Sequence, residues 1–220
     1  MIAVVDYGIG NLRSAEKALQ HVGADAHLVT DPDVAASAQA LVLPGVGAFG
    51  ACAAALRASG LDVAVRDVIE RGVPFLGICV GFQLLFEGSD EDPHAEGLAL
   101  VPGSVRRLAA TERLPQMQWN VVRPVEGRPS RLLGTAGSGA GGEADSSSAG
   151  WFYFVHSYAP VPAAEAAGAV VGLCDYGGPV VAAVEQGSLF GTQFHPEKSG
   201  ATGLQLLRRF ASLCGELKAA

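Results

Sequence analysis

The chain has 220 residues, of which 49% are hydrophobic and 17% charged, and its formal net charge is −7. This length allows one large domain or two small ones, and we expect one domain over residues 1–220. No apolar run reaches the roughly 18 residues of a spanning helix, and no cluster of Lys and Arg suggests a nucleic-acid partner. We therefore expect neither a membrane nor a nucleic acid as partner, and, since no export signal is visible, a cytoplasmic protein.

Short apolar runs alternate with helix-like patterns in the first part of the chain. Strands are predicted at 2–5, 26–29, 40–43 and 74–78. Helices are predicted from Leu12 to Val22, with Asn11 as N-cap and Gly23 as stop, and around 61–69. Strands that alternate with helices form a mostly parallel sheet covered on both faces. An α/β fold is therefore predicted.

The second part of the chain has a different pattern. Predicted strands at 104–108, 121–125, 151–155, 169–174, 180–185 and 189–193 are separated by turns, and a closing helix is predicted at about 202–217. These strands indicate an antiparallel extension of the sheet. The segment 134–150 consists almost entirely of Gly, Ser and Ala, so we interpret it as a flexible surface loop within the domain.

One of the four cysteines has the setting of a nucleophile. Cys52, Cys174 and Cys214 form no C-x-x-C pair with each other or with Cys79, so neither a metal site nor a cofactor is expected. Cys79 follows a predicted strand and has a glycine two residues away on each side. This G-x-C-x-G pattern is typical of a nucleophile elbow, whose sharp turn tolerates only small neighbours. A helix N-terminus there favours the thiolate, although a packed core cysteine is the alternative.

A candidate base lies in the sequence G-T-Q-F-H-P-E-K-S, residues 191–199. If this segment is extended, the side chains of His195 and Glu197 point to the same side, so the carboxylate can orient the imidazole. A chance surface pair is the alternative. His156 is the one rival base, since His21, His27 and His94 lie in segments that we interpret as structural or solvated.

The sequence P-G-V-G at residues 44–47 follows directly on the predicted strand 40–43. It can be a simple tight turn. Its glycines also allow backbone N–H groups of Gly45, Val46 or Gly47 to point toward a developing oxyanion, together with the N–H of Val80.

Together these motifs resemble the class I (triad) glutamine amidotransferases. The resemblance implies a flavodoxin-like three-layer fold and hydrolysis of the glutamine side-chain amide through a cysteinyl thioester. It assigns Cys79 as nucleophile, His195 as acid and base, and Glu197 as the group that orients it. It also implies that Gln83 and the backbone at Ser157 and Tyr158 contact the substrate glutamine.

Further motifs along the chain resemble one branch of this family, the glutaminase subunits of imidazole glycerol phosphate synthase. These are D-Y-G-I-G-N-L-R-S (6–14), P-G-V-G-A-F (44–49), Y-F-V-H-S-Y (153–158) and Q-F-H-P-E-K-S (193–199). The resemblance implies a heterodimer with a cyclase subunit that receives ammonia in histidine biosynthesis. The implied partner surface contains Asn11, Met117, Trp119, Asn120 and Lys198.

One segment departs from the pattern of that branch. Where the family usually has P-H-M-G-W-N, this chain has P-Q-M-Q-W-N at 115–120, with Gln116 for His and Gln118 for Gly. The details of docking to the cyclase are therefore open. Two other hypotheses remain: a glutaminase that serves anthranilate, aminodeoxychorismate or pyridoxal phosphate synthase, and a non-catalytic interaction module of the same fold. The intact Cys79, His195 and Glu197 argue against the second.

Overall fold

The computed structural model of the chain describes residues 1–108, 112–134 and 150–215. One half of its larger sheet is parallel, in the spatial order β2-β1-β3-β4-β13. These strands are β1 (Ile2–Val5), β2 (Ala26–Val29), β3 (Ala40–Gly45), β4 (Phe75–Cys79) and β13 (Leu189–Thr192). The order is that of flavodoxin-like sheets, in which the first strand lies between the second and third.

The other half of the larger sheet is antiparallel and continues from β13 in the order β12-β11-β8-β9. Its strands are β12 (Pro179–Gln186), β11 (Val170–Asp175), β8 (Gln116–Pro124) and β9 (Gly150–His156). The predicted α/β class with an antiparallel extension is confirmed. β13 is the exception in the second part of the chain, because it pairs in parallel with β4.

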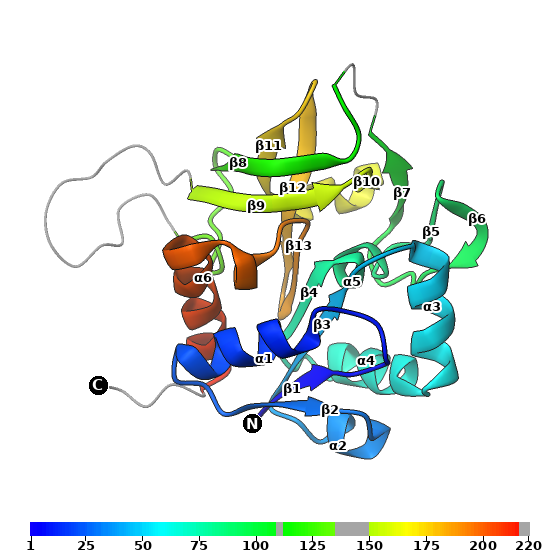
Figure 1. Cartoon of the computed structure of the whole chain (residues 1–220), viewed down its shortest axis with the longest axis vertical. Coiled ribbons are helices and arrows are strands. Elements are labelled where there is room, and N and C mark those ends of the chain that lie inside the picture. The colour runs from blue at the N-terminus through cyan, green and yellow to red at the C-terminus, as the bar shows by residue number, and fades with distance from the viewer. Residues whose placement is uncertain (109–111, 135–149, 216–220) are drawn as a thin grey trace, which may run out of the picture.

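Helices cover both faces of the parallel strands (Figure 1). On one side α1 (Leu12–His21) packs against α6 (Gly200–Leu213), and on the other α4 (Leu61–Glu70) contacts α2 (Pro32–Ala36) and α3 (Phe49–Ala58). Apolar residues at helical spacing, such as Leu12, Ala15 and Leu19 of α1, form the buried faces. Asn11 precedes α1 as predicted, but its side-chain oxygen accepts a hydrogen bond from the Ser14 hydroxyl and not from a backbone N–H.

A second, smaller sheet was not predicted as such. It has the order β10-β7-β5-β6 and contains β10 (Tyr158–Pro162), β7 (Gly103–Arg107), β5 (Gly88–Ser89) and β6 (Asp92–Glu96). β9 and β10 are separated by one residue, Ser157, so the chain passes there from the larger sheet to the smaller one. This crossing is next to the pocket described below.

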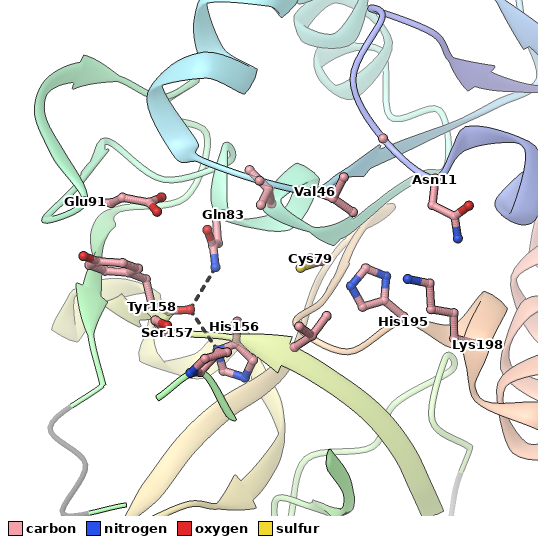
Figure 2. A pocket seen from close by; sticks show the side chains of 15 residues that line it. Asn11, Val46, Cys79, Gln83, Glu91, His156, Ser157, Tyr158, His195 and Lys198 are labelled. Atoms are coloured by element: carbon pink, nitrogen blue, oxygen red, sulfur yellow. Dashed lines mark hydrogen bonds between the residues drawn. The ribbon is translucent and has the colours of Figure 1, made fainter. Parts of the chain in front are cut away.

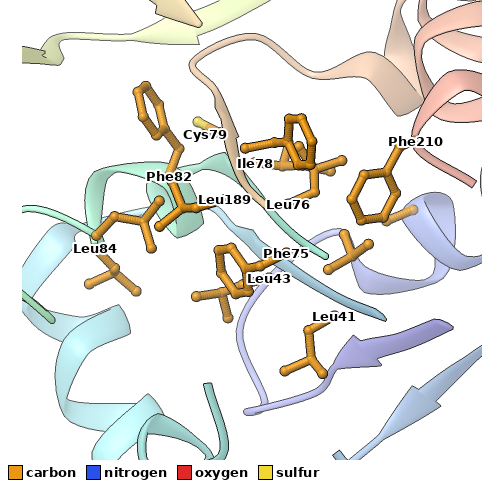
Figure 3. Packing of buried hydrophobic residues seen from close by; sticks show 14 of the residues in the cluster. Leu41, Leu43, Phe75, Leu76, Ile78, Cys79, Phe82, Leu84, Leu189 and Phe210 are labelled. Atoms are coloured by element: carbon orange, nitrogen blue, oxygen red, sulfur yellow. The ribbon is translucent and has the colours of Figure 1, made fainter. Parts of the chain in front are cut away.

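The core is continuous around β4 (Figure 3). Every residue of β4 is buried, and Phe75, Leu76 and Ile78 pack among side chains of β3, β13 and α6, such as Leu43 and Phe210. Burial of each such side chain contributes about 1.5–3 kcal/mol relative to exposure. The carboxyl end of β4, where Cys79 lies, is therefore held within the buried core.

The remaining elements are short. They are the helix α5 (Val80–Gln83) and the 3-10 helices η1 (Ala164–Ala169) and η2 (Pro196–Lys198). The flexible loop predicted at 134–150 falls almost wholly on residues outside the described ones, as does the end of the helix predicted at 202–217. In the part of the chain that is described, no helix is both long and apolar enough to span a membrane.

Candidate active site

A pocket of about 640 Å³ opens at the carboxyl ends of the parallel strands. Ligands of open α/β sheets bind at this edge. Gly45 of β3 lies opposite Cys79 of β4 in the sheet register. The pocket brings together most of the predicted site residues (Figure 2): Asn11, Val46, Gly47, Cys79, Val80, Gln83, Ser157, Tyr158, His195 and Lys198.

Cys79 has the backbone of a nucleophile elbow. Its φ of 55° and ψ of −112° lie outside the usual regions for an L-residue, and α5 begins at the next residue. The flanking glycines are required by close packing: a Cβ at Gly81 would lie 1.8 Å from the carbonyl oxygen of Leu43, and one at Gly77 would lie 2.8 Å from Cα of Phe82. The predicted turn geometry at Cys79 is confirmed.

His195, labelled at the right-hand side of the pocket in Figure 2, forms a buried pair with Glu197. Nδ1 of His195 lies 2.8 Å from Oε1 of Glu197, and both side chains are almost completely buried. The expected contact is present, but the expected reason is wrong. The chain does not remain extended, because Pro196–Lys198 form a 3-10 turn that brings the carboxylate back to the ring.

Strand β9 holds this turn in place. The N–H of His195 donates to the carbonyl of Tyr153 at 3.0 Å, and the N–H of Tyr153 donates to the hydroxyl oxygen of Ser199 at 3.0 Å. The Ser199 hydroxyl in turn donates to the carbonyl of His195. The backbone on both sides of the catalytic candidate is thus fixed to the outer edge of the antiparallel half-sheet.

The electrostatics of His195 suit a proton carrier. Burial disfavours its charged form, but Cys79 and Glu197, on its two sides, outweigh burial and raise its pKa to about 10. Nε2, the ring nitrogen opposite Glu197, has no hydrogen-bonding partner among the described residues. This nitrogen is available to the sulfur and to a substrate.

The rival base, His156, has the opposite electrostatics. Burial lowers its pKa to about 4, the hydrogen bond to Tyr158 partly offsets this, and the charge of His195 lowers it further. Because the Tyr158 carbonyl can only accept, Nδ1 of His156 is the donor in their 2.9 Å contact. His156 is therefore neutral, lies without a carboxylate partner in the described structure, and serves as a donor to backbone.

Two buried side chains donate hydrogen bonds to backbone carbonyls of the glycine turn at the end of β3. The Tyr7 hydroxyl donates to the carbonyl of Pro44 at 2.9 Å, and the Cys52 thiol donates to the carbonyl of Val46 at 3.3 Å. Within the described chain, the N–H of Gly47 donates to no other group. Val80, the first residue of α5, lines the same pocket. Free N–H groups near Cys79 are the arrangement that an oxyanion site needs.

Gln83 and the crossing from β9 to β10 form the left-hand side of the pocket in Figure 2. Nε2 of Gln83 donates to the carbonyl of Tyr158 at 2.9 Å. The carbonyl of Ser157 accepts from the N–H of Leu108. Both carbonyls are thus occupied, so a ligand meets N–H groups and the Ser157 hydroxyl here.

Two polar residues of this site were missed by the sequence reasoning. Glu91 lines the pocket at its rim, and its carboxylate accepts a hydrogen bond from the N–H of Phe49 at 2.8 Å. Gln193 is fully buried and contacts Cys79. Glu91 gave no signal, since it follows other acidic and polar residues. Gln193 did give one: it stands two residues before His195 at the end of an apolar strand.

The residues predicted to face a partner divide into two groups. Met117 and Trp119 are 64% and 48% exposed on one face of β8, and Trp119 lies edge-on to Tyr153 of β9. Lys198 lies over the same Tyr153 ring, 6.0 Å from its centre. Asn120 points to the opposite face and donates to the carbonyl of Asp175. Among the Gln residues that depart from the family pattern, Gln116 is buried, whereas Gln118 is exposed.

The fold and this geometry agree with comparisons to known proteins. A family model described as "Glutamine amidotransferase class-I" matches residues 3–213. The chain therefore belongs to the class I glutamine amidotransferase family.

Curated relatives narrow the comparison. "Imidazole glycerol phosphate synthase subunit HisH" of Moorella thermoacetica is 46% identical over 212 residues, covering 96% of this chain and 94% of the relative. The protein of the same name from Salinibacter ruber is 46% identical over 220 residues, covering 97% and 94%. A solved structure described as "Crystal structure of glutamine amidotransferase" has a TM-score of 0.70 at 24% identity and covers 97% of this chain and 98% of its own. At that identity the likeness supports the fold alone.

Proposed function

We propose that this chain is the glutaminase subunit of an imidazole glycerol phosphate synthase. It hydrolyses L-glutamine to glutamate and ammonia and passes the ammonia to a separate cyclase subunit in histidine biosynthesis. The proposal is supported by relatives of that name over nearly the whole chain. The observation that carries the chemistry is the position of Cys79, at a strained elbow, in one pocket with His195, which is itself paired with buried Glu197.

The first half of the reaction uses the pair as an acid. His195 is protonated at neutral pH, since its pKa is raised to about 10, and its positive charge favours the thiolate of Cys79. The thiolate attacks the side-chain amide carbon of glutamine, and N–H groups of Val80 and of the 45–47 turn stabilise the negative oxygen. The carbon–nitrogen bond then breaks as His195 gives its Nε2 proton to the nitrogen, which leaves as ammonia.

The second half of the reaction uses the same histidine as a base. Neutral His195 takes a proton from a water molecule, whose oxygen attacks the thioester carbon. The carbon–sulfur bond breaks, glutamate leaves and the thiolate is restored. Glu197 holds the ring through Nδ1 in both steps, so that Nε2 continues to face the reacting atoms.

The pocket offers a suitable place for the amino-acid end of glutamine. Among the described lining residues Glu91 is the one carboxylate, and we assign it to the α-ammonium group of the substrate. N–H groups and the hydroxyl at Ser157 suit the α-carboxylate, while Gln83 borders the side chain. A zwitterion is thus matched by charge at one end and by backbone donors at the other.

The exposed apolar face of β8 and β9 is the surface that we assign to the cyclase. Met117, Trp119 and Trp151 are all exposed there, and Trp151 is 58% exposed. In the β8–β9 register Val155 and Tyr153 lie opposite Met117 and Trp119, so these side chains form one continuous patch. Patches of this kind mark protein interfaces. Asn11 and Lys198 lie at the pocket and extend the proposed contact toward the catalytic residues.

Coupling to a partner has a chemical reason. Ammonia released into water is protonated and loses its nucleophilic lone pair, so hydrolysis is useful only beside an acceptor site. A cytoplasmic location belongs to the same proposal, since Cys52, Cys79 and Cys174 form no disulfide within the described part of the chain.

The test is glutamine hydrolysis by the purified chain, alone and with the cyclase subunit and its ribotide substrate. We expect weak hydrolysis alone and a strong increase in the complex. Cys79→Ala should abolish both rates and also the labelling of the chain by a glutamine-analogue electrophile. Equal rates with and without the cyclase would contradict the coupling, and labelling that survives in Cys79→Ala would contradict the nucleophile.

A further inference from the structure

Gln193 connects the nucleophile to the substrate-binding side of the pocket from within the protein. It follows β13 directly, and since Thr192 lies opposite Ile78 in the register of β13 and β4, Gln193 is next to Cys79. Its Nε2 lies 3.8 Å from Sγ of Cys79, and its Oε1 accepts from Nε2 of Gln83 at 3.1 Å. The side chain is fully buried, and the backbone N–H of Gln193 donates to the carbonyl of Ala182.

The surroundings of Gln193 permit one orientation of its amide. Nε2 of Gln83 has two N–H groups, and they go to the Tyr158 carbonyl and to Oε1 of Gln193. If the amide of Gln193 were turned over, its NH₂ would face the NH₂ of Gln83, and its oxygen would face the sulfur. The contact between the two NH₂ groups would be repulsive, and so would the contact of the oxygen with the sulfur whenever the sulfur is a thiolate. The amide N–H of Gln193 is therefore directed at the sulfur.

We propose that Gln193 is a further catalytic residue of the glutaminase reaction, a donor to Cys79 Sγ that stabilises the thiolate. This inference rests on the proposed function and deepens it. A neutral donor is strongest when its acceptor is charged, so the contact strengthens when sulfur is anionic and weakens when the thioester neutralises it. The sulfur is anionic before its bond to the amide carbon forms and after its bond to the acyl carbon breaks.

Gln193 thus contributes at both ends of the reaction, which His195 cannot do alone. In the second half His195 is occupied with the proton of the attacking water, and the sulfur departs without a proton. A fixed amide N–H at the sulfur stabilises this leaving group. The contact needs no movement of charge or proton from Gln193 itself.

The same side chain also fixes Gln83. Because both N–H groups of Gln83 are used by Tyr158 and Gln193, its own amide orientation is set as well. Its Oε1 is then the group left for the pocket, which Gln83 lines. Loss of Gln193 should therefore change both the reactivity of Cys79 and the binding of glutamine.

The test compares the alkylation of Cys79 by iodoacetamide, at fixed neutral pH, in two variants. Gln193→Met removes the amide N–H and the amide oxygen at nearly constant side-chain length. Gln193→Asn keeps the amide but shortens the side chain, so that the amide no longer reaches Cys79 and Gln83. Mass spectrometry of the Cys79 peptide separates this thiol from the other three. We expect each variant to lower the alkylation rate and kcat about tenfold, and to raise KM for glutamine about threefold.

Gln186→Met and Gln186→Asn are matched controls, since Gln186 is exposed on the neighbouring strand β12. They should react at the rate of the unmodified chain. Thermal unfolding of every variant shows whether it is folded. One folded Gln193 variant is enough for the comparison of alkylation rates. A lower melting temperature with an unchanged rate of Cys79 alkylation would mean a purely structural role and would overturn the proposal.

The alkylation result is independent of the proposed function, because iodoacetamide needs no glutamine. An unchanged rate in the Gln193 variants counts against Gln193 alone. Absence of glutamine hydrolysis by the unmodified chain in complex with the cyclase counts against the function alone.

Discussion

The pKa values of two histidines in one pocket are shifted in opposite directions by their neighbours. For His195 burial opposes the charged form, but the hydrogen-bonding and charge interactions with Cys79 and Glu197 outweigh it and raise its pKa to about 10. His156 is buried beside a carbonyl and near the positive His195, and its pKa is lowered to about 4. Burial disfavours the charged form of both, so the neighbouring groups decide the outcome. In the sequence the two differ only in that Glu197 stands two residues from His195, whereas no acid stands two residues from His156.

The low pKa of His156 predicts a loss of stability in acid. In the unfolded chain an imidazole binds its proton near pH 6.5, whereas folded His156 binds it only near pH 4. The unfolded state thus holds more protons between these values, and the free energy of unfolding falls as pH drops through them, by about 3 kcal/mol in total. Urea unfolding at several pH values should show this slope reduced in His156→Asn.

His195 acts in a separate pH range and does not obscure this test. Its raised pKa gives stability that is fully present below pH 6.5 and is lost as pH rises toward 10. His94→Asn is the matched control, since His94 is exposed on β6. If the unmodified chain and His156→Asn lose stability in parallel between pH 6.5 and 4, the neutral state of His156 is wrong.

Glu91 offers a prediction about substrate binding. Glu91→Gln removes the negative charge but keeps an oxygen for the N–H of Phe49, so the start of α3 is preserved. Because Glu91 lies at the exposed rim, we expect KM for glutamine to rise only about threefold to fivefold, with kcat nearly unchanged. Steady-state kinetics measure this, with Glu96→Gln on β6 as control. A fall in kcat at constant KM would exclude a role in holding the α-ammonium group.

At the scale of elements, the elbow between β4 and α5 is set by contact with β3. The short helix can follow the strand so closely only because Gly81 lies against the carbonyl of Leu43. This is a property of two neighbouring strands and one helix together. The strained backbone of Cys79 is maintained by that packing.

Gly81→Ala should therefore destabilise the protein by about 3 kcal/mol or more, since its Cβ would lie 1.8 Å from a backbone oxygen that cannot move alone. Denaturant unfolding measures the change. Gly168→Ala in η1 is the control, because a Cβ there meets nothing within 4 Å, and its effect should stay within about 0.5 kcal/mol. Equal stability of the two variants would show that the turn relaxes freely.

At the scale of the whole molecule, the surface that we assign to the partner lies on one side. The patch around Trp119 and Tyr153 lies on the antiparallel half of the larger sheet, away from α2 and α4 (Figure 1). Trp119→Ala should weaken the complex with the cyclase by about 2 kcal/mol, roughly 30-fold in Kd. Titration calorimetry measures it, and Val63→Ala on the far helix α4 is the control. Unchanged affinity would place the docking surface elsewhere.

The sequence was sufficient for the parallel strands and for α1 and α4, whose signals are local, whereas α2 and α3 were not predicted. Each strand there is a short apolar run and each helix has an apolar stripe, so most boundaries fall within a few residues of the predicted ones. The smaller sheet was not predicted because β5 has two residues and β6 reads D-P-H-A-E, without alternation. β6 pairs with β5, and β5 pairs with β7, whose other neighbour, β10, comes from a distant part of the chain.

For the site as well, residues with a local sequence signal were predicted and residues that meet only on folding were not. Cys79 and its glycines form a local pattern, and the proximity of His195 and Glu197 in sequence was enough to pair them. Glu91 and Gln193 depend on folding, since one reaches the pocket across 42 residues from Phe49 and the other meets Cys79 across 114. The prediction of one domain over residues 1–220 stays a prediction.

The hydrogen bonds that tie β9 to the turn at His195 also affect how the free subunit behaves in storage. Among the described strands β9 is the last of its sheet, and an open sheet edge is a template for aggregation. Here the peptide of Tyr153 is already bonded on that edge by His195 and Ser199. The segment that carries His195 therefore also covers the edge of the sheet, so damage to the pocket at His195 and loss of solubility should go together.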